Sequence, residues 1–358
     1  MLKPRANIER MPSYHSPSGE RVALNLDLNE NTGGCSPRVL RRLSALTTAD
    51  IASYPDREAG ERVAARFFGL APEQVLLTNG VDEGLQLLAF TYLSDGDEVI
   101  VSDPTFAMYP VDVAAAGATL VNVFSGDDFT FPLAGVLKAI TPRTKMILIA
   151  NPNNPTATIA AREDLLKVIE AAPNAAVLID EAYFEFYGET VLDLLSKYEN
   201  LLVSRTFSKA YGLAGLRIGA MLGNPQQIGY MRRITPPFNV NVVALACLPV
   251  AIGDQQFVAD YLRQVFDGRS RLQSLCTELG LQFWPSYTNF VLVRVGEKHS
   301  EFMQAMRARG INLRDRSNDP GCEGCIRITI GTAEQNELLF DAMRTVLAEL
   351  GISRKVTA

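Results

Sequence analysis

The chain has 358 residues, of which 47% are hydrophobic and 21% are charged, a composition typical of globular proteins that bury a large core. Its formal net charge of −6 disfavours nucleic acid as the main partner, because a phosphate backbone requires clustered Lys and Arg. The length predicts two domains.

No stretch has the apolar length of a secretory signal or a membrane span, so we expect a cytoplasmic protein without a membrane partner. Five cysteines are an odd number scattered through a long chain, which indicates reduced thiols instead of a disulfide framework. Cys322 and Cys325 form a CxxC pair. One pair without a second pair or a nearby His is weak evidence for zinc, and we interpret it as a loop feature and expect no metal.

The first two thirds of the chain alternate between two patterns. Apolar residues have helical spacing over 59–68 and 82–92,. Short apolar or β-branched runs, typical of strands, cover 74–77, 98–101, 119–123, 145–150, 175–179 and 200–203. Strands separated by helical segments predict an α/β core, with a mostly parallel sheet covered on both faces.

The pattern changes after the break at Thr235-Pro236-Pro237-Phe238, where consecutive prolines force extended backbone,. Long helical segments follow at 242–251, 255–279 and 300–309, with strand-like runs at 290–295 and 326–330. This order predicts a smaller α+β domain. We therefore expect an N-terminal arm and part of the small domain over 1–45, a large domain over 46–238 and a C-terminal small domain over 239–358.

Polar residues follow three of the predicted strands. Asn154 comes after 145–150, Asp180 and Tyr183 come after 175–179, and Ser208 and Lys209 come after 200–203. Ligands of open α/β sheets bind at the carboxyl ends of strands, so these side chains should meet at one edge. A lysine there can form a Schiff base with pyridoxal phosphate, while a carboxylate keeps the ring nitrogen protonated and an amide and a phenol bind the ring oxygen.

A phosphate cradle is predicted where the run Asn79-Gly80-Val81-Asp82-Glu83-Gly84 joins a strand to a helix, because the first amides of a helix bind anions,. Taken alone, the run is better explained as a capped helix. Thr206, Ser208 and Arg217 could complete the cradle. Phe106 could stack on the ring, although ordinary core packing is the alternative.

Together these residues resemble fold type I pyridoxal phosphate enzymes, and within the aspartate aminotransferase superfamily they resemble the histidinol-phosphate aminotransferase family. The resemblance implies a large domain with a mostly parallel, mixed sheet of the seven-stranded type between helices, plus a smaller α+β domain. The matching segments are 28–31, 54–56, 81–84, 151–156, 180–183, 206–219 and 325–332.

By this resemblance Lys209 forms the Schiff base and shuttles a proton, assisted by Asp180 and Tyr183, in a ping-pong transamination between histidinol phosphate and 2-oxoglutarate, which leaves as glutamate. The resemblance also implies a homodimer in which Tyr54 reaches the partner's cofactor phosphate.

The same resemblance implies that Arg314, Arg327 and Tyr14 bind the substrate. A second arginine, Arg316, lies two residues after Arg314. One departure is Ala157, which stands where the family usually has glycine. Alanine is tolerable there with a negative φ and destabilising with a positive one.

Three other functions remain open. An aromatic amino-acid aminotransferase would use the same cofactor residues. A threonine-phosphate decarboxylase would release carbon dioxide and need no 2-oxo acid. A pyridoxal-binding transcription regulator would carry a basic helix-turn-helix segment ahead of this domain, whereas this acidic chain begins with a short arm.

Overall fold

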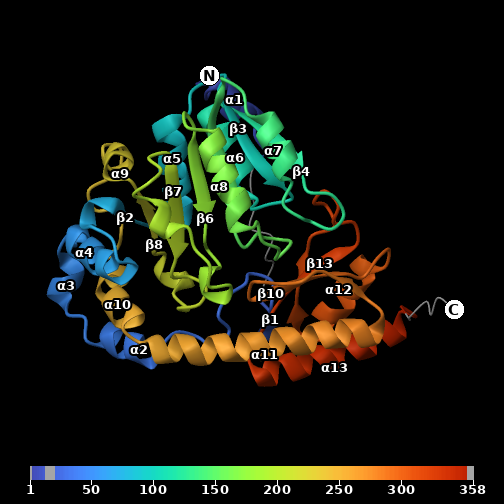
Figure 1. Ribbon diagram of the computed structural model, residues 1–358. Helices are drawn as coiled ribbons and strands as arrows, with labels where there is room; N and C mark the ends of the chain where they lie inside the picture. The colour runs from blue at the N-terminus through green and yellow to red at the C-terminus, as the bar shows by residue number, and fades with distance from the viewer. Residues whose placement is uncertain (1, 13–20, 353–358) are drawn as a thin grey trace.

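The computed structural model describes residues 2–12 and 21–352. A seven-stranded sheet flanked by helices dominates it (Figure 1). Across the sheet the strands are β2 (Val75–Thr78), β8 (Gly219–Gly223), β7 (Leu201–Thr206), β6 (Ala176–Asp180), β5 (Thr144–Ala150), β3 (Glu98–Asp103) and β4 (Thr119–Phe124). β8 runs antiparallel to both neighbours and the remaining adjacent pairs are parallel. The prediction of an α/β protein with a mostly parallel, mixed sheet is confirmed.

Alternate residues of the central strands face two separate cores. In β6, Val177 and Ile179 belong to one core, and Ala176 and Leu178 belong to the other. The first core is closed by α4 (Arg57–Phe68), α7 (Leu133–Ala139), α8 (Arg162–Ala171) and α10 (Val242–Ile252), and the second by α5 (Gly80–Tyr92), α6 (Met108–Ala116) and α9 (Pro225–Arg232). Because both faces are covered, these strands read as unbroken apolar runs.

β8 is the strand of the seven-stranded sheet that the sequence pattern did not predict. Its five residues begin and end with glycine and include no β-branched side chain, so they lack the composition that indicates a strand. Tertiary packing between β2 and β7 overrides that weak local preference.

A second, four-stranded antiparallel sheet lies in the C-terminal part of the chain, which we call the small domain; its order is β12 (Arg314–Asp315), β13 (Cys325–Thr329), β10 (Phe290–Arg294) and β9 (Gln282–Phe283). Its helices are α11 (Gln255–Leu279), α12 (His299–Ala308) and α13 (Ala333–Glu349). α13 was not among the predicted elements, although a capping box of Thr332 and Gln335 marks its start,. In Figure 1, α11 extends beneath the large sheet and the small-domain strands alike.

The N-terminal segment touches both domains. α1 (Ala6–Arg10) lies against α6, where Asn7 Nδ2 donates to the Ala114 carbonyl at 2.8 Å. Farther along, β1 (Leu24–Asn25) pairs in parallel with β11 (Ile311–Asn312). The remaining short helices are α2 (Pro37–Ser44), α3 (Thr48–Ala52) and the 3₁₀ turns Pro72–Gln74, Phe184–Phe186, Leu192–Leu194 and Ala214–Leu216.

Within the described ranges, no single helix is long and apolar enough to cross a membrane. Only α10 and α11 taken together reach the length and apolar composition of a membrane span among the described residues, and the two helices are bent by 79° from each other. α10 is apolar because most of its side chains are buried in the core, among them Leu245 and Leu248.

A buried ion pair joins the strands that end at the polar edge of the sheet. Arg205, in β7, donates from Nε to Glu181 just after β6 at 2.8 Å. Both side chains are almost fully buried, and the Arg205 guanidinium lies 3.5 Å from the Phe184 ring centroid. Glu181 also accepts from the Val191 amide at 2.9 Å. Because the Glu181 carboxylate is buried away from water, its negative charge is stabilised by these protein partners,.

We expect Arg205→Met to lower the free energy of unfolding by about 3–5 kcal/mol, because it leaves the buried Glu181 carboxylate without its cation. Arg263→Met is the matched control. It removes an exposed partner of Asp260 and should cost about 1 kcal/mol or less. Urea unfolding followed by circular dichroism measures both, and equal losses in the two variants would contradict the importance of the buried pair.

Candidate active site

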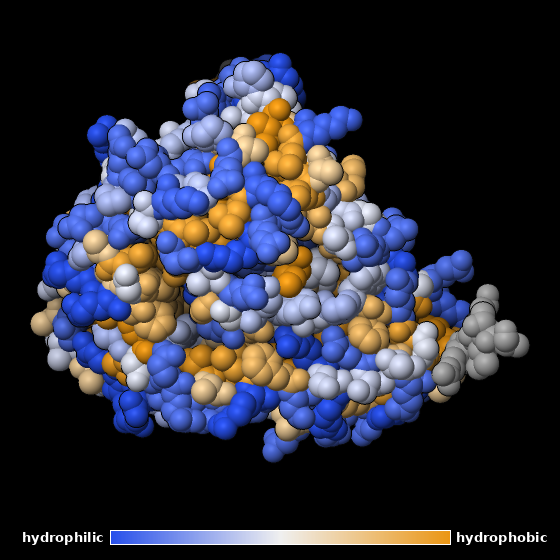
Figure 2. Space-filling view, viewed as in Figure 1, coloured by the Kyte–Doolittle hydropathy of each residue, from blue (hydrophilic) through white to orange (hydrophobic). Residues whose placement is uncertain are grey.

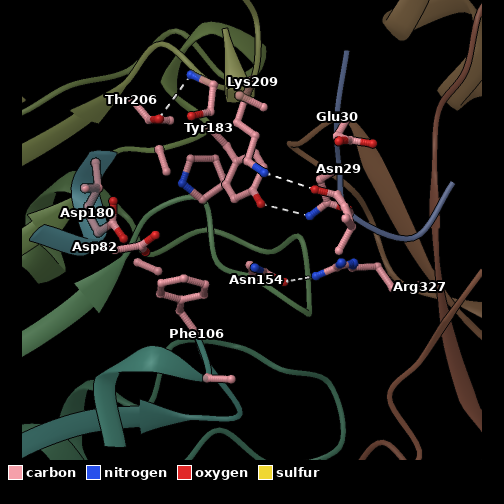
Figure 3. Close-up of a pocket in the computed structure, with 18 of the residues that line it drawn as sticks. Asn29, Glu30, Asp82, Phe106, Asn154, Asp180, Tyr183, Thr206, Lys209 and Arg327 are labelled. Atoms are coloured by element: carbon pink, nitrogen blue, oxygen red, sulfur yellow. Dashed lines mark hydrogen bonds between the residues drawn. The ribbon is translucent and has the colours of Figure 1, made fainter. Parts of the chain in front are cut away.

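A cavity of about 470 Å³ lies where the carboxyl ends of the large-domain strands face the small-domain sheet (Figure 3). It brings together most of the site residues predicted from the sequence: Val81, Asp82, Phe106, Asn154, Asp180, Tyr183, Thr206, Ser208, Lys209, Arg217, Arg314 and Arg327. Leu28, Asn29, Glu30 and Arg316 also line it. These four positions carried no predicted site role.

Lys209 follows β7 and points into the cavity (Figure 3). Its Nζ donates to the Leu28 carbonyl at 3.1 Å. Burial lowers the pKa of Lys209 from 10.5 to about 8, and the nearby Arg327 guanidinium contributes to the shift, while Glu30 and Asp82 oppose it. A lysine with such a pKa has a much larger neutral fraction near physiological pH than an ordinary lysine, as a nucleophilic amine requires.

Asp180 is the last residue of β6 and is only 4% exposed. One carboxylate oxygen accepts from Ser204 Oγ at 2.7 Å and the other from Tyr109 Oη at 2.8 Å. Burial raises the pKa of Asp180, and these two hydrogen bonds partly offset that effect. A carboxylate oxygen has two lone pairs, so the group can still accept a proton donor from the cavity.

Tyr183 is anchored by the N-terminal arm. Asn29 Nδ2 donates to Tyr183 Oη at 2.8 Å, and the Asn29 backbone amide donates to Thr329 Oγ1 at 3.0 Å. Asn29 has φ 56°, a left-handed conformation that asparagine tolerates better than most residues,. Burial raises the pKa of Tyr183, so its hydroxyl stays protonated and can donate into the cavity.

Arg327 connects the small domain to the large one. Its Nη1 donates to Asn154 Oδ1 at 2.5 Å, and its Nη2 donates to the Asp27 carbonyl at 2.6 Å. Burial lowers the pKa of Arg327 to about 9, and the positive charges of Arg316 and Arg314 add to the shift. Arg314 lies opposite Arg327 in the β12–β13 pairing.

The start of α5 forms the other end of the cavity. Arg217 Nη2 donates to Asp82 there at 2.8 Å. Gly80 has φ 79°, and a Cβ at that position would lie 2.5 Å from Arg217 Nη2. A Cβ on Gly219 would lie 2.8 Å from the Val81 nitrogen. These two glycines therefore let the helix start, the arginine and the adjoining strand approach closely enough to surround one anion.

Tyr54 is a predicted site residue that does not line the cavity. Tyr54 is 81% exposed and stacks on Phe238 with ring centroids 4.3 Å apart. Tyr14 lies outside the described residues. Phe106, by contrast, faces the space in front of Asp180 (Figure 3) and meets the Tyr109 ring edge-on at 5.6 Å.

Several contacts escaped the sequence interpretation. Tyr109 and Ser204, which hold Asp180, are three residues after Phe106 and two residues before Thr206, but nothing local marks either as its partner. Asn29 lies within one of the segments that carried the family resemblance, which was the available signal for it.

Ala157, in the turn after Asn154, has φ 63° and is fully buried. The left-handed conformation is therefore present in spite of the methyl group, at a cost of about 1–2 kcal/mol. Hydrogen bonds hold the turn from both sides: the Ala157 amide donates to the Asn153 carbonyl at 3.0 Å, and the Ala157 carbonyl accepts from the Tyr287 amide at 2.9 Å. The Asn154 side chain keeps its place in the cavity.

The combination of groups fits one kind of molecule. An amine of lowered pKa, a buried carboxylate, a phenol and an amide surround the centre of the cavity, and a helix start with an arginine forms one end. An aromatic aldehyde that carries a phosphate and a ring nitrogen would find a partner for each of its functional groups.

Comparison with known proteins agrees with this chemistry. Residues 21–343 match the family described as aminotransferase class I and II. Histidinol-phosphate aminotransferase 1 of Bacillus anthracis is 35% identical over 353 residues, which cover 97% of this chain and 94% of the relative. The histidinol-phosphate aminotransferase of Thermoanaerobacter pseudethanolicus is 34% identical over 332 residues, which cover 90% and 92%.

The crystal structure of histidinol-phosphate aminotransferase from Sinorhizobium meliloti in complex with pyridoxal-5'-phosphate has a similar fold. Its TM-score is 0.88 at 27% sequence identity, and the match covers 98% of this chain and 99% of that one. The fold is therefore that of fold type I pyridoxal phosphate aminotransferases.

The lowered pKa of Lys209 can be measured directly. We expect the rate of reductive methylation of Lys209 by formaldehyde, measured by mass spectrometry, to rise with pH with a midpoint near 8, because only the neutral amine reacts,. In Arg327→Gln the midpoint should move to higher pH, since a cation that disfavours the ammonium has been removed. A midpoint that stays fixed in this variant would contradict the electrostatic coupling.

Proposed function

Because this chain belongs to the class I and II aminotransferase family, we propose that it transfers the amino group of histidinol phosphate to 2-oxoglutarate, with pyridoxal 5'-phosphate as cofactor, in the biosynthesis of histidine. The observation that carries the choice of substrate is the identity of about 35% along nearly the whole chain to relatives named for that reaction. The same family implies a reaction in two halves at one site: the phosphorylated amine would give up its amino group and leave as the corresponding ketone, and 2-oxoglutarate would then take up that amino group and leave as glutamate.

Pyridoxal phosphate supplies an aldehyde that captures amines and a ring that accepts electrons from the substrate carbon. Lys209 is the residue that would hold this aldehyde covalently, and its amine, once displaced by substrate, would move a proton between the substrate carbon and the cofactor. Its lowered pKa supports both roles, because the amine must be neutral to accept a proton.

Asp180 would keep the ring nitrogen protonated, and its contacts with Ser204 and Tyr109 fix the carboxylate for this purpose,. Tyr183 and Asn154 would bind the ring oxygen, and Phe106 would stack on the ring,. Val81, Asp82, Thr206, Ser208 and Arg217 would enclose the phosphate,. Arg314 and Arg327 would bind the anionic group of the substrate, with Tyr14 as a further contact.

Association into a homodimer is part of the proposal. Leu40, Ile51, Tyr54 and Phe238 are each at least half exposed, and the helices that carry Leu40 and Ile51 both pack on α10. Figure 2 shows hydrophobic surface, interrupted by polar side chains, in the part of the molecule where α4 and α10 lie in Figure 1. Apolar surface of this kind is suited to a second copy of the chain. Tyr54 would then reach the partner's cofactor phosphate.

We also propose the cytoplasm as the location of the enzyme, as the sequence predicts. All five cysteines are free thiols, and four of them are buried. Cysteines that form no disulfide fit a reducing compartment.

The substrate can be tested by following the absorbance of the cofactor in single half-reactions. We expect histidinol phosphate and glutamate to convert the holoenzyme to its amino form, and phenylalanine to do so much more slowly. Lys209→Ala should show neither the covalent cofactor absorbance nor any transamination, whereas the exposed control Lys197→Ala should behave as the wild type. Faster conversion by phenylalanine would favour an aromatic aminotransferase, and carbon dioxide released from threonine phosphate would favour the decarboxylase.

A mixing experiment tests the shared site. In the proposed dimer each active site takes Lys209 from one subunit and Tyr54 from the other. A mixed dimer of Lys209→Ala and Tyr54→Ala subunits therefore has one site with both residues intact and one site with neither. We expect the mixture, after denaturation and reassembly, to regain activity at about a quarter of the wild-type sites if subunits pair at random. A mixture no more active than the mean of its two components would rule out a Tyr54 contribution across the interface.

A further inference from the structure

Arg316 shares one face of the small-domain sheet with two substrate arginines. Arg314 lies opposite Arg327 in the register of β12 and β13, and Arg316 follows Arg314 by two residues. The Arg316 amide continues this pairing by donating to the Cys325 carbonyl at 3.0 Å. Because side chains alternate along a strand, Arg314 and Arg316 point to the same side. All three arginines line the cavity.

The Arg316 side chain is buried, at only 8% exposed, and is held in place by a short loop. Asp319 forms an ion pair with its guanidinium, and the Asp319 amide donates to the Arg316 carbonyl at 3.0 Å. Cys322 and Cys325, both fully buried, pack this loop against Trp284. The CxxC pair therefore contributes to the packing around the loop that holds Arg316.

One guanidinium nitrogen of Arg316, its Nε, is buried and has no hydrogen-bond partner among the described residues; the same holds for Nε of Arg327. The acidic groups that interact with these arginines are Asp27 and Asp319, and Asp319 is the one that pairs with Arg316. Buried donors without partners are costly unless a ligand satisfies them. Three guanidiniums also attract a phosphate dianion more strongly than a carboxylate with one charge.

We infer that Arg316 is a specificity residue, which joins Arg314 and Arg327 in a subsite that favours a phosphomonoester dianion over a single carboxylate. This inference rests on the proposed function. It adds a residue that selects the phosphorylated amine over unphosphorylated competitors. Glutamate, which presents one carboxylate to the same arginines, depends on Arg316 less.

The test compares histidinol phosphate with histidinol, which has the same amine without the phosphate, in half-reactions of the holoenzyme. In Arg316→Gln the preference for the phosphorylated donor, measured as a ratio of kcat/KM values, should fall roughly 10- to 100-fold, as expected for loss of one charged hydrogen-bonding group. The rate with glutamate should change much less. Arg309→Gln, which alters an exposed pair with Glu349, gives the same change in net charge and should keep the wild-type ratio.

Removing Arg316 alone leaves Asp319 unpaired, so the variant Arg316→Gln/Asp319→Asn separates specificity from stability. The ratio should fall in this double variant too, while its cofactor absorbance matches the wild type. A ratio within about twofold of the wild type, or an equal loss for both donors, would overturn the assignment of Arg316.

Failure of the proposed function would look different. If the wild type does not react with histidinol phosphate, inorganic phosphate as a competitor of the glutamate half-reaction still tests Arg316. Weaker inhibition of Arg316→Gln than of the wild type supports the dianion subsite, and equal inhibition overturns it.

Discussion

The site depends on the parallel register of β5, β6 and β7. Ala150 of β5 pairs with Asp180 of β6, which in turn pairs with Ser204 of β7, so β5 and β6 end at the same level and β7 continues two residues farther. The loops that follow them carry Asn154, Tyr183 and Lys209 to one cavity. A slip of one residue in β6 would turn the Asp180 side chain to the opposite face of the sheet. The hydrophobic alternation that fills the two cores therefore also fixes where the carboxylate points, and the Arg205–Glu181 pair reinforces that alignment.

The cavity gathers several charged groups away from water, and each of them is restrained by a neighbour. Asp180 has two hydroxyl donors, Arg327 has a backbone carbonyl and the Asn154 amide, and Lys209 has the Leu28 carbonyl. These restraints limit how far the side chains must reorient when a charged ligand enters. Groups that are already oriented stabilise the charge that develops during a reaction more effectively. Both domains and the N-terminal arm contribute these restraints, so the cavity acquires its electrostatics only when the whole chain has folded.

The sequence predicted the elements with strong local signals. The apolar strands and α11 are present where the sequence predicts them, with boundaries that differ by a few residues. The polar residues that follow these strands line one cavity, as expected. β8 was missed because glycine, alanine and methionine give no strand signal. The partners of Asp180 and Tyr183 could not be predicted from the residues alone, since Tyr109, Ser204 and Asn29 come close to them only through packing between elements far apart in the chain. The sign of φ at Ala157 likewise depends on the three-dimensional turn.

The length of α11 has a mechanical consequence. This helix has 25 residues and so is about 37 Å long. Asp254, just before its first turn, is tied to Ser36 and Arg38 beside the large domain. The helix also contacts β10, which pairs with the strand that carries Arg327. A tilt of about 5° at the tethered end of such a rod displaces the other end by about 3 Å, comparable to a hydrogen-bond length. Minor pivoting near Asp254 would be enough to engage or release the arginines, with neither sheet deformed.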